Sequence, residues 1–183
     1  MFYPSDASYQ KDTNKVRLKG KFLPSRNEDM PTLLWFPDVL EPAENFEKWF
    51  TNPNNKVLDY RNVWLLNPRN FGESDHHDSF EMEVLSTLKK DVSNDIMRFM
   101  NEKKLTTVTV GGHGYGAKIA CVFGSLFYNR VSGVACFEGG PINHSFHKAW
   151  ESVKEYIIQC SQIPTDNISS TDFLKRVDTI VDV

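Results

Sequence analysis

The segment from Thr106 to Phe123, TTVTVGGHGYGAKIACVF, constrains the fold of this chain more than any other. It begins with a β-branched run, 106–110, passes through a cluster of four glycines, and continues as an apolar segment of helix-forming residues. β-Branched residues favour strands, and glycine supplies the turn conformations that other residues avoid. The segment therefore predicts a strand, a sharp turn and a helix that are joined with almost no linker.

Alternating strand and helix signals surround this segment and predict an α/β fold with a mostly parallel sheet. Five strands are expected, the first at an edge and the fourth at the centre: 15–23, 32–36, 62–66, 106–110 and 131–137. Five helices are expected from apolar residues at helical spacing: 42–50, 79–103, 115–128, 145–160 and 170–181. The last two follow one another without a strand between them. We therefore expect one domain, with a core over residues 1–143 and a helical cap-like segment over 144–183.

The glycine cluster resembles the nucleophile elbow of the α/β-hydrolases, in which a serine stands at the centre of G-x-S-x-G. The matching residues in this chain are Gly112, His113, Gly114, Tyr115 and Gly116. The position of the nucleophile therefore holds Gly114, which has no side chain to attack a carbonyl.

A second loop strengthens this resemblance. Residues 67–74, NPRNFGES, follow an expected strand and look like the D-x-R-x-x-G-x-S loop of many α/β-hydrolases. The version in mitochondrial-type abhydrolase-domain esterases is the most similar, and four positions keep its pattern: Arg69, Asn70, Gly72 and Ser74. Two positions depart from it: Asn67 and Phe71. The resemblance covers about residues 15–160 and implies a truncated α/β-hydrolase-like sheet flanked by helices, in a mitochondrial location.

The same resemblance shows which catalytic groups the chain lacks. Hydrolysis of this kind needs a nucleophile, a histidine base, an orienting carboxylate and N–H donors for the oxyanion. Gly114 removes the nucleophile, Pro37 lacks an N–H at the expected oxyanion turn, and Asp38 beside it would repel an oxyanion. The histidine of the triad follows the last strand in the family, but no histidine follows His147. We expect no catalytic residues and a pseudoenzyme that serves as an accessory or scaffold subunit of a protein complex.

Two other functions stay open at this point. One is a hydrolase completed by a second chain. The other is a nucleotide or small-ligand binding module, because Gly112–Ala117 also satisfies the dinucleotide pattern G-x-G-x-x-A, with Glu138 near the expected acidic position. That pattern normally opens the first β-α-β unit, whereas several expected strands precede it here.

The charge and hydropathy of the chain exclude other classes of function. The net charge is −3 and the basic residues are scattered, so no basic surface is expected for a nucleic-acid partner. No apolar run approaches the roughly 18–20 residues that a transmembrane helix needs.

No metal or cofactor site is expected. The run Asp75–Asp78, DHHD, is interpreted as a solvated turn, since four consecutive residues rarely converge on one ion. The three cysteines, Cys121, Cys136 and Cys160, lie in apolar segments without metal-like spacing. We expect them to be buried core thiols in a reducing intracellular compartment.

The strand expected at Val131–Phe137, VSGVACF, is apolar and contains neither proline nor charge. The resemblance implies two further strands that continue the sheet beyond it, and we expect neither of them from the residues that follow. An open apolar edge pairs readily with another strand. The sequence therefore predicts a protein partner that covers this strand.

Overall fold

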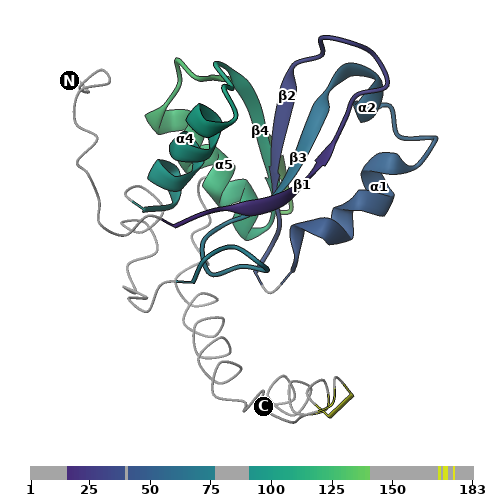
Figure 1. Ribbon diagram of the computed structural model, residues 1–183, viewed down its shortest axis with the longest axis vertical. Coiled ribbons are helices and arrows are strands. Elements are labelled where there is room, and N and C mark those ends of the chain that lie inside the picture. Colours follow the sequence, from purple (N-terminus) through teal and green to yellow (C-terminus); the bar gives the residue numbers. More distant parts are fainter. Residues whose placement is uncertain are drawn as a thin grey trace. The chain divides into compact units, whose positions relative to one another are not determined.

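Figure 1 shows the computed structural model of the chain. The structure describes residues 16–39, 41–76 and 91–140, together with four isolated positions near the C-terminus: Ser169, Thr171, Asp172 and Lys175. The chain divides into two units, Met1–Pro141 and Ile142–Val183, and the fold below is that of the first. The expected helix 145–160, nearly all of 170–181, and residues 79–90 of the expected helix 79–103 lie outside the described residues.

Within the described residues, five strands form one sheet in the order β1-β3-β2-β4-β5. Their bounds are β1 Lys19–Leu23, β2 Thr32–Phe36, β3 Asn62–Asn67, β4 Val108–His113 and β5 Val131–Phe137. β1 runs antiparallel to β3, and all other neighbours are parallel. The α/β fold with a mostly parallel sheet is therefore confirmed.

The position of β2 corrects one expectation. The strand expected to be central, 106–110, corresponds to β4, but β2 holds the centre, with β3 on one side and β4 on the other. Burial along the whole of β2 accounts for its uninterrupted apolar sequence, TLLWF. β4 begins later than expected, at Val108. It also ends later, because Gly111 and Gly112 continue the ladder by pairing with Trp35 and Phe36.

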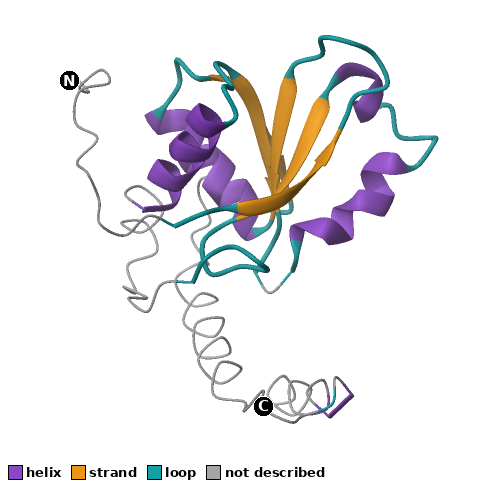
Figure 2. Cartoon of the chain, viewed as in Figure 1, coloured by secondary structure: helices purple, strands orange, loops and turns teal. Residues whose placement is uncertain are grey.

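Helices cover both faces of the sheet (Figure 2). α4, Ser93–Glu102, and α5, Tyr115–Leu126, lie on one face, where they bury Leu34 and Phe36 of β2. The 3-10 helix η1, Ala43–Phe46, and the short helices α1, Glu47–Thr51, and α2, Val57–Tyr60, lie on the other face. Complete burial of a side chain such as Phe36 stabilises the fold by about 1.5–3 kcal/mol.

One expected helix differs in form, and another keeps its predicted spacing. The expected helix 42–50 is split into the 3-10 turn η1 and the α-helix α1. α4 carries its buried apolar residues at helical spacing, as the sequence predicts, and they are Ile96, Met97, Phe99 and Met100. α2 was not expected from the sequence.

Candidate functional site

The turn between β4 and α5 has the geometry of a nucleophile elbow. Gly114 lies between the last residue of β4 and the first of α5, with φ 50° and ψ −109°, which only glycine adopts without strain. Its N–H donates a 2.9 Å hydrogen bond to the carbonyl of Phe137 in β5. The strand, turn and helix are therefore joined without a linker, as the sequence predicts.

The backbones around this turn pack very closely. A Cβ atom on Gly112 would overlap the carbonyl group of Gly116, and a Cβ on Gly116 would overlap the carbonyl group of Phe36 in β2. The first turn of α5 therefore lies directly on the carboxyl ends of β2 and β4. This is where an open α/β sheet places its ligands.

The carboxylate of Asp38 fills the space that a nucleophile would need. Asp38 follows β2, and a Cβ atom on Gly114 would overlap its carboxyl group. The Oδ1 atom accepts hydrogen bonds from the backbone N–H of Tyr115 at 2.7 Å and of Val39 at 2.8 Å. In the elbow of a hydrolase, the N–H after the nucleophile stabilises the oxyanion. Here that donor is engaged by an anion of the chain itself.

The sequence places Asp38 near the expected oxyanion turn but does not show that its carboxylate occupies the elbow. Seventy-seven positions separate Asp38 from Tyr115, so only the pairing of β2 with β4 brings them together. The one sequence signal was an acidic residue directly after a buried strand.

The ring of His113 lies among carboxylates beside this elbow. Its Nε2 atom is 3.1 Å from Glu138, and its Nδ1 atom is 3.5 Å from Glu41 and 4.0 Å from Asp38. The Nδ1 atom is buried and has no hydrogen-bond partner among the described atoms. Glu138 adopts a positive φ of 49°. The surroundings of the elbow are therefore acidic.

The acidic surroundings of the elbow argue against a nucleotide bound at Gly112–Ala117. A bound pyrophosphate would need the free N–H groups at the start of a helix. At α5 the N–H of Tyr115 is bound to Asp38, and Glu138 is bound to His113 rather than held open for a ribose. The geometry of Gly112–Ala117 thus disfavours a dinucleotide at this turn.

The loop after β3 connects the sheet to α4 through hydrogen bonds of its side chains. Arg69 donates to both carboxylate oxygens of Asp95 on α4, at 2.7 and 3.0 Å, and lies 3.6 Å from Asp91. Burial raises the pKa of Asp95 above its ordinary value, although the hydrogen bond and charge of Arg69 oppose this shift. The hydroxyl of Ser74 is buried, where it donates to the carbonyl of Asn67 and accepts from the N–H of Lys19.

The same loop reaches the elbow. The ring of Phe71 stacks on that of Tyr115, with centroids 5.8 Å apart and planes 1° from parallel. Burial raises the pKa of the Tyr115 phenol above its ordinary value. Phe71, a position that departs from the esterase pattern, therefore packs against the residue that follows Gly114.

The run Asp75–Asp78 is described only in its first half. Asp75 accepts a 2.8 Å hydrogen bond from the N–H of Arg17, and the Nε2 atom of His76 is 3.5 Å from the carbonyl of Gly72. In the described part of the chain, no group of three or more histidine, cysteine or acidic side chains could hold a metal ion.

The cysteines correct another expectation. Cys121 is only partly buried and Cys136 is exposed, so neither is a core thiol, while Cys160 lies outside the described residues. The reason is that Cys136 belongs to β5, an edge strand of the described sheet. Their sulfur atoms are 3.2 Å apart.

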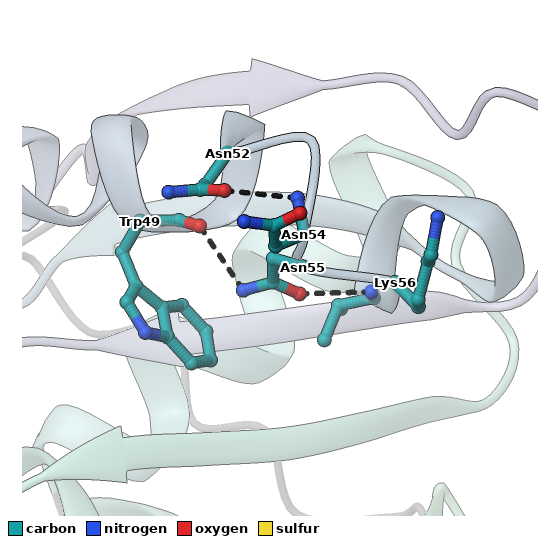
Figure 3. A pocket seen from close by; sticks show the side chains of 6 residues that line it. Trp49, Asn52, Asn54, Asn55 and Lys56 are labelled. Carbon is teal, nitrogen blue, oxygen red and sulfur yellow. Dashed lines mark hydrogen bonds between the residues drawn. The ribbon is translucent and has the colours of Figure 1, made fainter.

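A separate surface pocket of about 570 Å³ lies beyond the end of α1 (Figure 3). It is lined by Trp49, Asn52, Asn54, Asn55, Lys56 and Val57. Asn55 fixes its shape by donating to the carbonyl of Trp49 and accepting from the N–H of Val57. No elbow residue lines this pocket.

Comparison with known proteins defines the class. A family model described as alpha/beta hydrolase fold matches residues 40–159, more than half of the chain. This chain belongs to the α/β-hydrolase fold family. No curated protein matches it. Among the residues that the structure describes, no helix is long and apolar enough to cross a membrane.

Solved structures show the same fold at low sequence identity. An esterase from a marine microorganism superposes with a TM-score of 0.70 at 20% identity, covering 91% of this chain and 59% of the esterase. A thermophilic esterase from Thermogutta terrifontis superposes with a TM-score of 0.59 at 15% identity, and the match covers 82% of this chain and 49% of that esterase. An α/β-hydrolase from a Medee basin deep-sea metagenome superposes with a TM-score of 0.61 at 8% identity, and the match covers 79% of this chain and 48% of that hydrolase. The chain thus spans between about half and three fifths of the length of these structures.

Proposed function

We propose that this chain is a catalytically inactive α/β-hydrolase-fold protein that serves as an accessory or structural subunit of a protein complex. One observation carries the proposal: Gly114 stands at the nucleophile's position with the Asp38 carboxylate in the space beside it. Serine-type hydrolysis needs a nucleophile at this point and free N–H donors for the oxyanion. Asp38 leaves neither the space nor the Tyr115 donor, and its negative charge would repel a developing oxyanion.

The test is labelling with a fluorophosphonate probe together with hydrolysis of p-nitrophenyl acetate. A serine esterase of the same fold serves as the positive control, and heat-inactivated protein sets the background. We expect no stoichiometric labelling and no hydrolysis above background. Stoichiometric labelling of any serine would overturn the proposal.

The partner in this proposal binds at β5. In the described part of the chain β5 pairs only with β4, and Val134 and Phe137 are each 46% exposed. An exposed strand edge without charges accepts another strand or a packed surface. Hydrogen exchange at amides 131–137 provides the test, because a partner should protect amides that exchange quickly in the isolated chain. Strong protection in an isolated monomer would contradict this role for β5.

We propose a mitochondrial location on the resemblance of the loop 67–74 to mitochondrial-type esterases. Fractionation of cells that express the untagged protein, with markers for mitochondria and cytosol, tests this. Recovery only in the cytosolic fraction would contradict it.

A second candidate is a hydrolase completed by another chain. It is favoured by the partial coverage of the solved hydrolases, which leaves room for further strands and catalytic groups. The two proposals differ in what the native complex does. A complex whose partner carries the labelled serine supports the second candidate, whereas an unlabelled complex supports the first.

A further inference from the structure

Two thiols meet on the face of the sheet that α5 covers. Cys121 lies in α5 and Cys136 in β5, and their sulfur atoms are in contact at 3.2 Å. A disulfide needs its sulfurs about 2.0 Å apart, so the pair is within about an ångström of bonding distance. Secondary structure on both sides holds the two side chains together. The pair is thus preorganised rather than dependent on a chance encounter of two loops.

The two thiols differ in access. Cys136 is exposed on the edge strand, and among the described residues its sulfur contacts, besides Cys121, only the carbonyl of Ala117, at a long 3.9 Å. Cys121, in α5, is partly buried. In the chain without a partner at β5, a small reagent in solution can therefore reach the sulfur of Cys136 more readily than that of Cys121.

We propose that Cys121 and Cys136 are a modification site that forms a reversible intramolecular disulfide by exchange with a low-molecular-weight disulfide such as glutathione disulfide. The thiolate of Cys136 attacks one sulfur of the small disulfide, forming a mixed disulfide and releasing one small thiolate. Cys121 then loses its proton to solvent and attacks the Cys136 sulfur, releasing the second small thiolate. Two protein thiols are oxidised and one small disulfide is reduced to two thiols.

The order of attack follows from the surroundings of Cys121. Burial, together with its hydrogen bond to Cys136, raises the pKa of the Cys121 thiol to about 11, although the charge of Lys118 opposes the shift. At neutral pH Cys121 is almost entirely a thiol, and the thiolate is the reactive form. Cys121 is therefore the resolving residue and acts only once the mixed disulfide has formed beside it.

The bond would fix the edge of the sheet. It would join the middle of α5 to β5 and close the chain segment between residues 121 and 136, which contains the turn that connects them. A cross-link of this length restricts the unfolded chain and should raise Tm by roughly 6–12 °C. In a reducing compartment the pair stays as two thiols, and it closes only when the thiol-disulfide balance shifts toward oxidation.

The experiment uses the full-length chain with Cys160→Ser, which keeps both proposed residues. It is equilibrated in glutathione buffers of increasing oxidised fraction, alkylated, and analysed by intact mass and by non-reducing peptide mapping. We expect the loss of two hydrogen atoms, a cross-linked peptide pair containing Cys121 and Cys136, and the rise in Tm, all reversed by dithiothreitol. Absence of the cross-linked peptides throughout the series would overturn the proposal.

Two matched variants test the order of attack. Cys121→Ser should accumulate a stable glutathione adduct on Cys136, because no resolving thiol is present. Cys136→Ser should form an adduct on Cys121 at least tenfold more slowly at pH 7.5. Circular dichroism checks that both variants fold. In wild type, a cross-link from either residue to Cys160, or between two chains, in place of the 121–136 bond would also overturn the proposal.

Discussion

The Oδ1 atom of Asp38 lies 2.7 Å from the backbone nitrogen of Tyr115, so the loop after β2 supplies an anion to the first turn of α5. A helix N-terminus is a ready-made site for negative charge, since its N–H groups lack partners and its dipole is positive. The elbow of this protein therefore keeps the anion-binding geometry of a hydrolase, but the anion belongs to the protein. The contact that our proposal makes responsible for the loss of catalysis would also stabilise the start of α5.

Replacement of Asp38 should reveal this stabilising role. We expect Asp38→Ala to lower the free energy of unfolding by about 0.5–2 kcal/mol, because the N–H of Tyr115 loses its acceptor. Asp38→Asn should lower the free energy of unfolding by less, since an amide oxygen still accepts the hydrogen bond and only the negative charge at the N-terminus of α5 is lost. Urea denaturation measures both. Glu28→Ala, at an exposed position, is the control and should change stability by less than 0.5 kcal/mol.

Introducing a serine at the elbow should not create an esterase. We expect Gly114→Ser to leave p-nitrophenyl acetate hydrolysis at background and to lower stability by more than about 1 kcal/mol, because a side chain at φ 50° is strained and overlaps Asp38. The control is Gly140→Ser, where a new Cβ has no neighbour within 4 Å. A large gain in esterase rate from Gly114→Ser would show that a base and an open oxyanion site are already present.

The double variant Asp38→Ala with Gly114→Ser separates strain from overlap. Removing the Asp38 carboxylate should relieve the overlap but not the backbone strain, so the two effects on stability should be less than additive. Additive losses would show that the carboxylate moves away from the new side chain at little cost.

Some features of this site could be predicted from the sequence, and others depend on contacts that it does not show. The glycine spacing predicted the elbow, because a strand, a positive-φ turn and a helix leave a local signature. The Asp38 contact is not local, since it depends on which strand lies beside β4. The same limit explains why the sequence predicts a buried Cys136: an apolar strand such as β5 has the same composition at the edge of a sheet as at its centre.

The loop after β3 shows the same limit. Its pattern was recognised, but the partners of its side chains lie in α4 and β1 and could not be inferred from spacing. Arg69 binds Asp95 across 26 positions, and Ser74 binds the N–H of Lys19 across 55. These contacts give the loop a role in stability that does not require catalysis.

Loss of Arg69 should therefore be costly. Its side chain is 10% exposed and that of Asp95 is fully buried, so Arg69→Ala leaves the Asp95 carboxyl group in the interior without its two-pronged hydrogen bond and with Arg98, at 3.5 Å, as the remaining ion-pair partner. We expect a loss of about 3–5 kcal/mol in the free energy of unfolding. Arg61→Ala is the matched control, because in the described part of the chain its guanidinium bonds only to the carbonyl of Tyr60, and the substitution should lower stability by less than 1 kcal/mol. Equal losses in the two variants would contradict a structural role for the buried pair.

The raised pKa of Asp95 predicts a pH dependence with a definite sign. The folded protein binds a proton at Asp95 more tightly than the unfolded chain, whose aspartate has the ordinary value near 3.8. The contribution of Asp95 to stability is therefore greatest below pH 3.8 and falls as the pH rises through the folded pKa. Asp95→Asn removes this titration, so the stability of wild type relative to Asp95→Asn should decrease as pH rises from 3.8 and then level off. An increase over the same interval would mean that pairing with Arg69 outweighs burial.

Ser74 offers the sharpest test of what the family-like loop does here. Ser74 is 2% exposed. Its hydroxyl links two strands: it donates to the carbonyl of Asn67 in β3 at 2.7 Å and accepts from the N–H of Lys19 in β1 at 2.8 Å. Ser74→Ala would leave both backbone groups without this partner, at a cost of about 1–3 kcal/mol.

The control for Ser74→Ala is Ser125→Ala. Among the described residues, the exposed hydroxyl of Ser125 bonds only to a carbonyl of its own helix, that of Val122, so this substitution should change stability by less than about 0.5 kcal/mol. Urea denaturation gives both values, and hydrogen exchange should show faster exchange of the Lys19 amide in Ser74→Ala alone. If the two variants lost equal stability and the Lys19 amide stayed protected, the Ser74 hydroxyl would not reinforce the end of the β1–β3 ladder. A loss confined to Ser74→Ala would mean that this part of the hydrolase pattern stabilises the sheet independently of any catalysis.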